Sequence, residues 1–297
     1  KLVSKELDLT LTTRDRNKPA EERTPMCGVP YHSVEAYLAR LIAKGYKVAI
    51  CEQMEDPALA KGLVDRDIIR IVTPGTVIDA SMLEEGKNNF IAAVCRTGSG
   101  AGACFCDIST GEVSATAFSG RDWQEPLFNE LGRFAPREAV LDTAAWEDVE
   151  LREFLRLRLD CRCELGREED FAPDRAMETA RKQFRTGLED LPSEAEAAVR
   201  ACGGLLIYLY ETQKTELSHL TAFRYYTGGE FMELDLTARR NLELTETMRG
   251  KEKKGSLLWV LDKTRTAMGH RLIRSWMERP LLSPVQVNKR LDAVEDL

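Results

Sequence analysis

Three short apolar runs joined by glycine-containing turns constrain the fold of this chain more than any other feature. The runs cover residues 90–94, 103–108 and 112–118, with a turn expected over residues 98–102. Consecutive strands with such short connections predict an antiparallel meander. After the meander, predicted helices (121–132, 146–157 and one from Pro173) alternate with predicted strands (138–141 and 159–163). Strands followed by this alternation indicate an α/β layered domain.

The residues before the meander predict a small mixed α/β domain. Strands are expected over residues 7–13, 47–51 and 68–72. Ser33 is the expected N-cap of a helix, and Gly45 supplies its stop. The apolar stripe of that helix has the spacing i, i+3, i+4, i+7, i+8 and consists of Val34, Tyr37, Leu38, Leu41 and Ile42.

The second half of the chain contains strong helix-start signals. A Ser-x-x-Glu capping box at Ser193 and Glu196 opens a helix that contains the pair Gly203-Gly204. Two such glycines cost about 2 kcal/mol relative to alanine. Either a close backbone contact or a kink would explain them. Further helices are expected over residues 237–250 (capped by Thr237), from Ser256 and from Ser283, which makes the end of the chain all-α.

Charge divides the chain into three blocks. The N-terminal block (residues 1–82) holds 12 basic and 12 acidic side chains, the middle block (83–228) holds 17 and 26, and the C-terminal block (229–297) holds 13 and 11. The net charges are therefore 0, −9 and +2. Because phosphate binding needs local Lys and Arg, we expect contact with nucleic acid in the outer blocks and a protein partner for the acidic middle block.

The eight cysteines suit reduced, packed thiols in a cytosolic protein. A zinc site built from Cys104, Cys106, Cys161 and Cys163 is the less favoured interpretation. Residues 1–6 carry no apolar signal region, and no run of about 18 apolar residues occurs, so we expect neither secretion nor a membrane span. The chain opens without Met and is still helical in pattern at Leu297, so we expect a piece of a longer protein.

Signatures of catalysis are sparse. The sequence contains no phosphate loop, no Gly-x-Gly-x-x-Gly and no Gly-x-Ser-x-Gly. One alternative is a Mg²⁺-dependent, ribonuclease H-like nuclease that uses Asp107, with Asp142 or Asp160 as further carboxylates. The competing and favoured interpretation is that Asp107 accepts hydrogen bonds from turn amides before Gly111.

Several long motifs, in order along the chain, resemble the MutS family of mismatch-repair proteins. They are residues 25–33 (PMCGVPYHS), 48–53 (VAICEQ), 70–76 (RIVTPGT), 107–111 (DISTG), 239–244 (RRNLEL), 255–262 (GSLLWVLD), 264–269 (TRTAMG) and 278–281 (ERPL). The resemblance covers nearly the whole chain and is weakest over residues 119–190.

The resemblance implies a multidomain fold. Residues 1–82 are similar to a mixed α/β mismatch-binding domain that lacks its N-terminus. Residues 83–228 are similar to an α/β, ribonuclease H-like connector domain, and residues 229–297 to the all-α start of the core and lever domain. We expect the family's Phe-x-Glu wedge to lie before Lys1, and its clamp and ATPase domain beyond Leu297.

The resemblance also implies a function. The full-length protein would be a homodimeric ATPase that uses ATP and Mg²⁺, binds mismatched or looped double-stranded DNA, contacts MutL through the connector domain, and resides in the bacterial cytoplasm, on the nucleoid when bound to DNA. This chain would then be the non-catalytic, DNA-positioning and signal-relaying scaffold, with no catalytic residue, metal or cofactor of its own.

By the same similarity, DNA contacts fall in the N-terminal block. Arg14 and Arg66 would bind phosphates, because arginine pairs with phosphate oxygens without reading sequence. Met26 and Tyr31 would pack near the minor groove, and Arg16 and Arg70 are further candidates for contact with DNA. The loop that contains Arg14 and Arg16 also holds acidic residues, so a solvated loop is an equally good interpretation from composition alone.

Overall fold

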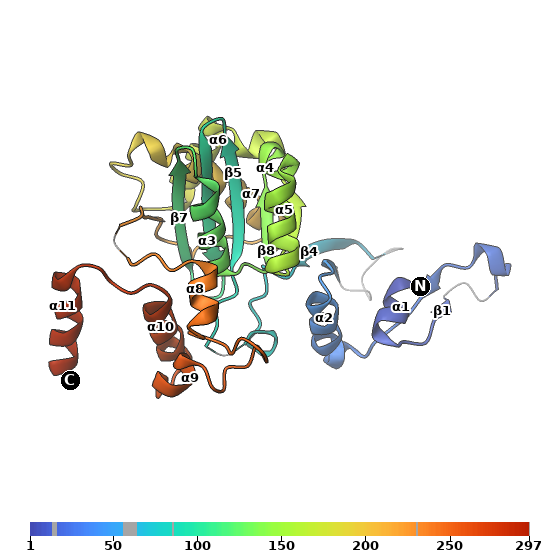
Figure 1. Cartoon of the computed structure of the whole chain (residues 1–297). Helices are drawn as coiled ribbons and strands as arrows, with labels where there is room; N and C mark the ends of the chain where they lie inside the picture. The colour runs from blue at the N-terminus through green and yellow to red at the C-terminus, as the bar shows by residue number, and fades with distance from the viewer. Residues whose placement is uncertain (14–16, 56–63, 85, 230, 297) are drawn as a thin grey trace.

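The computed structural model describes residues 1–13, 17–55, 64–84, 86–229 and 231–296. The middle block forms a central sheet flanked by helices. In Figure 1 the N-terminal block extends to the right of this sheet, and the C-terminal block lies below it and to its left. Within the described residues, no helix is both long and apolar enough to cross a lipid bilayer.

The central sheet has six strands in the order β10-β7-β6-β5-β8-β9. The predicted meander is confirmed, since β5, β6 and β7 pair antiparallel in sequence order, while β8 and β9 continue the sheet in parallel with β5. Short β10 pairs in parallel with β7. The strands are β5 Ile91–Thr97, β6 Gly100–Asp107, β7 Glu112–Ser119, β8 Glu138–Leu141, β9 Arg162–Leu165 and β10 Arg224–Tyr225.

The turn between β5 and β6 is shorter than the sequence indicates. Gly100 and Gly102, expected in a turn, are paired inside β6 with Thr97 and Cys95. The physical reason is close packing, because a Cβ on Gly102 would lie 2.0 Å from the carbonyl carbon of Ala197. Gly102 therefore lets the strand and helix backbones approach, and a Cβ on Gly100 would lie equally close to the Phe118 carbonyl of β7, so neither glycine marks a bend.

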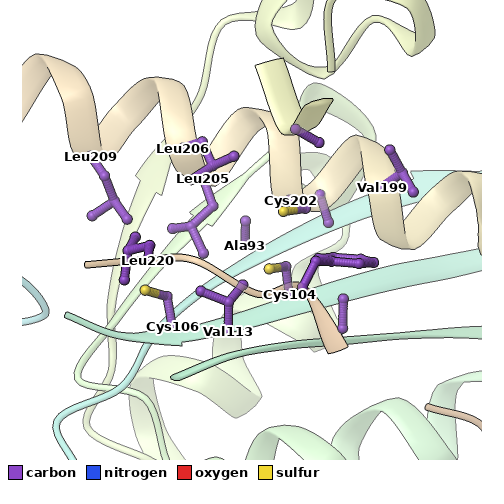
Figure 2. Packing of buried hydrophobic residues seen from close by; sticks show 14 of the residues in the cluster. Ala93, Cys104, Cys106, Val113, Val199, Cys202, Leu205, Leu206, Leu209 and Leu220 are labelled. Carbon is purple, nitrogen blue, oxygen red and sulfur yellow. The ribbon is translucent and has the colours of Figure 1, made fainter. Parts of the chain in front are cut away.

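Alternation along β5 divides the middle block into two cores. Ile91, Ala93 and Cys95 face one core, and Ala92 and Val94 face the other. Helices α6 Pro173–Gln183 and α7 Glu196–Gln213 cover the first face, and α3 Gln124–Phe134, α4 Thr143–Glu147 and α5 Val149–Glu153 cover the second. Figure 2 shows the first core, where leucines of α7 point toward Cys104 and Val113 of the sheet.

The glycine pair in α7 makes close contacts within an uninterrupted helix. The helix continues unbroken through Gly203 and Gly204. A Cβ on Gly203 would lie 2.3 Å from Ala176 Cα of α6, and one on Gly204 would lie 2.6 Å from the Phe171 ring. The pair therefore seats α7 against α6 and the turn before it.

The helix expected over residues 146–157 is interrupted. Asp148 ends α4 and also caps α5, since its side chain accepts a hydrogen bond from the Leu151 amide at 3.1 Å. A π-helical turn, Phe154–Arg158, follows α5. The acidic cap thus competes locally with continuation of the helix.

The described part of the N-terminal block contains two small sheets and two α-helices. Helix α2 Val34–Ala43 is confirmed, and strands β3 Val48–Gln53 and β4 Arg66–Val72 pair antiparallel close to their expected positions. Strands β1 Thr12–Thr13 and β2 Pro25–Met26 form the other pair. A small core of Leu38, Ile42, Val72 and Val77 joins α2 to the β3–β4 hairpin.

The strand expected over residues 7–13 is wrong for its first part. Leu7 ends helix α1, Leu2–Leu7, and Asp8 then adopts a left-handed conformation with φ 55°. Ser4 makes two hydrogen bonds across the C-terminal end of this helix. Its carbonyl accepts from the Leu9 amide at 2.8 Å, and its hydroxyl donates to the Leu9 carbonyl at 2.6 Å. These local bonds outweigh the apolar alternation that indicates a strand.

The C-terminal block is helical in its described part. It contains α8 Leu236–Asn241, α9 Leu257–Leu261, α10 Ala267–Glu278 and α11 Pro284–Glu295. Ser256 caps α9 as expected, with its hydroxyl accepting from the Trp259 amide at 3.2 Å. The helix expected over residues 237–250 is wrong in both ends. Asp235 caps it in place of Thr237, and it stops before Glu243, whose φ is 46°.

Candidate nucleic-acid interface

Three of the residues expected to contact DNA lie at the ends of elements in the N-terminal block. Met26 ends β2, where it pairs with Thr12, and Tyr31 opens the 3₁₀ turn Tyr31–Ser33 that leads into α2. Arg66 opens β4. Arg14 and Arg16 lie outside the described residues.

Arg66 and Tyr31 present exposed side chains. Tyr31 is 85% exposed, an unusual state for an aromatic ring, and Arg66 is exposed at the outer end of the β3–β4 hairpin, opposite Gln53. An exposed guanidinium can pair with a phosphate, and an exposed ring can pack against a sugar or base. Met26 is half-buried, so it exposes less apolar surface than Tyr31 does.

Arg70 is oriented differently, toward the inside of the molecule. Strand β4 becomes more buried along its length, from exposed Arg66 to Val72 at 2% exposure. Arg70 Nη2 donates to the Thr76 carbonyl at 3.0 Å, and burial lowers the pKa of its guanidinium. This side chain therefore holds the turn that follows β4.

Asp107 has the surroundings of a turn residue. It is fully buried, and Oδ1 accepts from the Ser109 amide at 2.9 Å and the Ser109 hydroxyl at 2.7 Å. Oδ2 accepts from Asn88 Nδ2 at 2.8 Å and the Asn89 amide at 3.2 Å. Four donors thus occupy both oxygens. The Ser109 amide is the turn donor that the favoured interpretation predicts, and Asn88 and Asn89 add donors from the segment before β5.

Asp107 and Asp142, two carboxylates of the nuclease alternative, do not converge. On either side of β5, Ile91 pairs with Cys106 and Val94 pairs with Leu141, which places Asp107 and Asp142 at opposite ends of that strand. Asp142 instead caps α4, with Oδ1 accepting from the Ala145 amide at 2.8 Å. Across the described part of the chain, no group of three or more His, Cys, Asp or Glu residues has the geometry of a metal site.

The four cysteines of the zinc interpretation also lie apart. Cys104 and Cys106 belong to the core on one face of the sheet, whereas Cys161 belongs to the core on the other face and Cys163 packs against it. Strands β5 and β8 separate β6 from β9. Burial raises the pKa of the Cys104 and Cys106 thiols, which keeps them protonated as packed side chains.

Comparison with known proteins identifies three segments in order. Family models described as MutS domain I, MutS domain II and MutS domain III match residues 1–81, 89–221 and 237–297. The chain is 47% identical over 296 residues to the DNA mismatch repair protein MutS of Ruminiclostridium cellulolyticum, which covers 100% of this chain and 34% of the relative.

Two further relatives give the same result. The DNA mismatch repair protein MutS of Acetivibrio thermocellus is 45% identical over 295 residues, covering 99% of this chain and 34% of the relative. That of Symbiobacterium thermophilum is 44% identical over 302 residues, covering 100% and 34%. The chain thus spans about a third of the length of these relatives. With domains I, II and III matched in order and this identity along its whole length, the chain belongs to the MutS family.

Proposed function

We propose that this chain acts in DNA mismatch repair as the part of a MutS protein that positions DNA and relays its state to the rest of the molecule. The observation that carries the proposal is the ordered match to MutS domains I, II and III, with 47% identity to a DNA mismatch repair protein over the whole chain. The exposed Arg66 and Tyr31 support it, because they supply the two kinds of side chain that hold a duplex.

The division of labour follows the three blocks. Residues 1–82 would bind the mismatch, residues 83–228 would form the connector, and residues 229–297 would begin the core and lever. A mixed sheet covered by helices on both faces supports a ribonuclease H-like fold for the connector. The helices of residues 229–297 support the assignment to the core.

Within the N-terminal block, Arg14 and Arg66 would bind phosphates and Met26 and Tyr31 would lie near the minor groove. Arg16 and Arg70 would be further DNA contacts, and the hydrogen bond of Arg70 to the Thr76 carbonyl ties its strand to the turn that follows. Phosphate contacts fix the register of a protein on DNA but carry no sequence information. A protein that must examine every base step requires this kind of contact.

Properties of the whole protein belong to the same proposal. We infer a homodimeric, cytoplasmic protein whose ATP and Mg²⁺ bind outside this chain and whose connector contacts MutL. The net charge of −9 on the middle block supports a protein partner there, since like charge repels a DNA backbone.

A salt titration of DNA binding tests the proposal. Alanine at both Arg14 and Arg66 should weaken binding to matched and mismatched duplexes by the same factor. The slope of log K against log salt should also become shallower by about one unit for each phosphate that the chain no longer neutralises. Fluorescence anisotropy with labelled duplexes measures both quantities.

Arg181→Ala is the matched control, because Arg181 is an exposed cation on α6 in the middle block. It should leave affinity and slope unchanged. If the double variant retains the affinity and the salt slope of the unmodified chain, the assignment of these arginines is wrong.

A further inference from the structure

A buried carboxylate joins the N-terminal block to the sheet. Glu138, the first residue of β8, is 0% exposed. Its Oε2 accepts hydrogen bonds from the Thr73 hydroxyl and from the Gly75 amide, the latter at 3.0 Å. Its Oε1 accepts from the Tyr208 hydroxyl at 2.5 Å. One side chain thus connects the turn after β4, the edge of β8 and helix α7.

The donors to Glu138 are all neutral. Two hydroxyls and one backbone amide surround it, and among the described residues no salt bridge reaches it. Burial and the Glu138 charge raise the pKa of the Tyr208 hydroxyl well above its ordinary value, so Tyr208 stays protonated and donates. Removing any one of these donors would leave a buried oxygen of Glu138 without a partner, which costs free energy.

The turn that supplies two of these donors, residues 73–76, is buried and packs against the sheet. Thr73 and Thr76 are both 0% exposed, and the turn is closed by hydrogen bonds from the Thr73 amide to Thr76 Oγ1 at 3.0 Å and from the Thr76 amide to the Thr73 carbonyl at 3.1 Å. At Gly75, an added Cβ would lie 2.8 Å from Ile91 Cβ and 2.9 Å from Glu138 Cβ. The turn backbone therefore rests directly on the sheet.

Contacts on both sides of the turn lead to the candidate DNA interface. Arg70 of β4 donates to the Thr76 carbonyl, which ties the strand that begins at Arg66 to the turn. Just before β3, Lys47 pairs with Glu164 of β9 at 2.8 Å and lies over the Tyr208 ring, with its Nζ 5.1 Å from the ring centroid. The β3–β4 hairpin is thus attached to the sheet around Glu138.

We propose that Glu138 is a positioning residue that fixes the orientation of the N-terminal block on the sheet. Through the turn and β4, it sets the direction in which Arg66 and its neighbours face. The statement about DNA rests on the proposed function, whereas the statement about orientation does not. Tyr208 and Thr73 are its partners, and loss of either weakens the same attachment.

Distance measurement between two spin labels tests the orientation. Labels are placed at Glu35→Cys on α2 and Glu153→Cys on α5, both exposed positions, after Cys27, Cys51 and Cys163 are replaced by Ser. Pulsed electron resonance on this chain should give a single narrow distance distribution. Glu138→Ala should broaden it at least twofold, and Glu138→Gln, which keeps the length and one acceptor, should broaden it less.

Asp142→Asn is the matched control, because Asp142 follows the same strand, is also buried and bonds only within the middle block. It should leave the distribution narrow. An equally narrow distribution in folded Glu138→Ala overturns the proposal. If Glu138→Ala does not fold, the same measurement is made on the double variant Tyr208→Phe, Thr73→Val, which removes both hydroxyl donors. A narrow distance distribution in that variant would also overturn the proposal.

A DNA measurement separates this proposal from the proposed function. Glu138→Ala should weaken binding of duplex DNA severalfold while retaining the salt slope, because the arginines remain and only their placement changes. If the unmodified chain binds no DNA, the proposed function fails while the spin-label result still decides the role of Glu138.

Discussion

At the residue scale, Gly102 in the middle block has no space for a larger side chain. Gly102 of β6 faces the backbone of α7, where an added Cβ would lie 2.0 Å from the Ala197 carbonyl carbon and 2.3 Å from the Ala198 nitrogen. Backbone atoms cannot move aside as a side chain can, so the helix itself would have to shift. Gly98, in the turn before the same strand, has open space, with no atom of the described chain within 4 Å of an added Cβ.

This difference predicts the stability of two variants. Gly102→Ala should lower the free energy of unfolding by about 3 kcal/mol, since it forces strand and helix apart. Gly98→Ala should change it by less than about 1 kcal/mol. Urea unfolding followed by circular dichroism measures both. Similar values for the two variants would show that the approach of β6 to α7 is not tightly held.

The residue scale also shows what the sequence could and could not predict. The turn role of Asp107 was accessible, because its bonds to Ser109 and the neighbouring turn are local. The role of Glu138 was not, because its donors Thr73 and Tyr208 lie 65 and 70 residues away. The sequence shows only an acidic residue at the start of an apolar strand. That pattern does not indicate which residues donate hydrogen bonds to it.

At the element scale, the connection between α9 and α10 is organised around one carboxylate. The Asp262 side chain is 1% exposed, and its Oδ2 accepts from Lys253 Nζ at 2.8 Å and contacts His270 Nδ1 at 2.6 Å. Its Oδ1 accepts from the Thr264 hydroxyl at 2.6 Å. Burial acts to raise the pKa of Asp262, but these donors outweigh it and hold the pKa well below the ordinary value.

The lowered pKa of Asp262 predicts an acid-dependent loss of stability. Because its pKa in the folded chain lies below that in the unfolded chain (about 3.9), its stabilisation is complete above about pH 5 and declines as the pH falls toward the folded value. Asp262→Asn should therefore reduce the free energy of unfolding at pH 6 and flatten its dependence on pH below 5. Denaturant titrations between pH 3 and 6 measure this.

Asp292→Asn, at an exposed position of α11, serves as the control and should follow the unmodified chain at every pH. An unchanged acid slope in Asp262→Asn would mean that the cluster around Asp262 does not stabilise the fold.

Elements were predictable where a local signal fixes both ends. Helix α2 has an apolar stripe and a glycine stop, and α9 has a serine cap, so both were located. Helix α1 was missed, because apolar alternation over residues 7–13 favours a strand, and the hydroxyl of Ser4 that closes the helix lies before that pattern. Helix α8 is shorter than expected, because the turn after Asn241 depends on contacts across residues 239–258.

At the scale of the whole molecule, the blocks differ in how much apolar surface they bury. The middle block has a core on each face of its sheet, whereas the described core of the N-terminal block consists of Leu38, Ile42, Val72 and Val77 with a few partly buried neighbours. A small core opens at a lower free-energy cost than a large one. The order of α/β, α/β and all-α blocks was predictable from pattern, whereas the attachment between the first two was not.

Hydrogen exchange should therefore resolve two levels of protection. Amides of α2 and β3 should exchange earlier than those of β5 and β6, which are surrounded by both cores. Glu138→Ala should hasten exchange in α2 and β3 further and leave β5 and β6 unchanged. Mass spectrometry of peptic fragments measures this. Equal protection in the two blocks would contradict the expectation that the smaller core of the N-terminal block opens at a lower free-energy cost.

The alternation of β5 between two cores has a consequence for the gene. Inserting or deleting one codon between Ile91 and Cys95 would send every following side chain of the strand to the opposite face, so both cores would receive the wrong partners at once. At Gly98, two residues before β6 begins, an extra codon would only lengthen a surface turn. Length variation among descendants of this gene should thus collect in such turns and spare the strand.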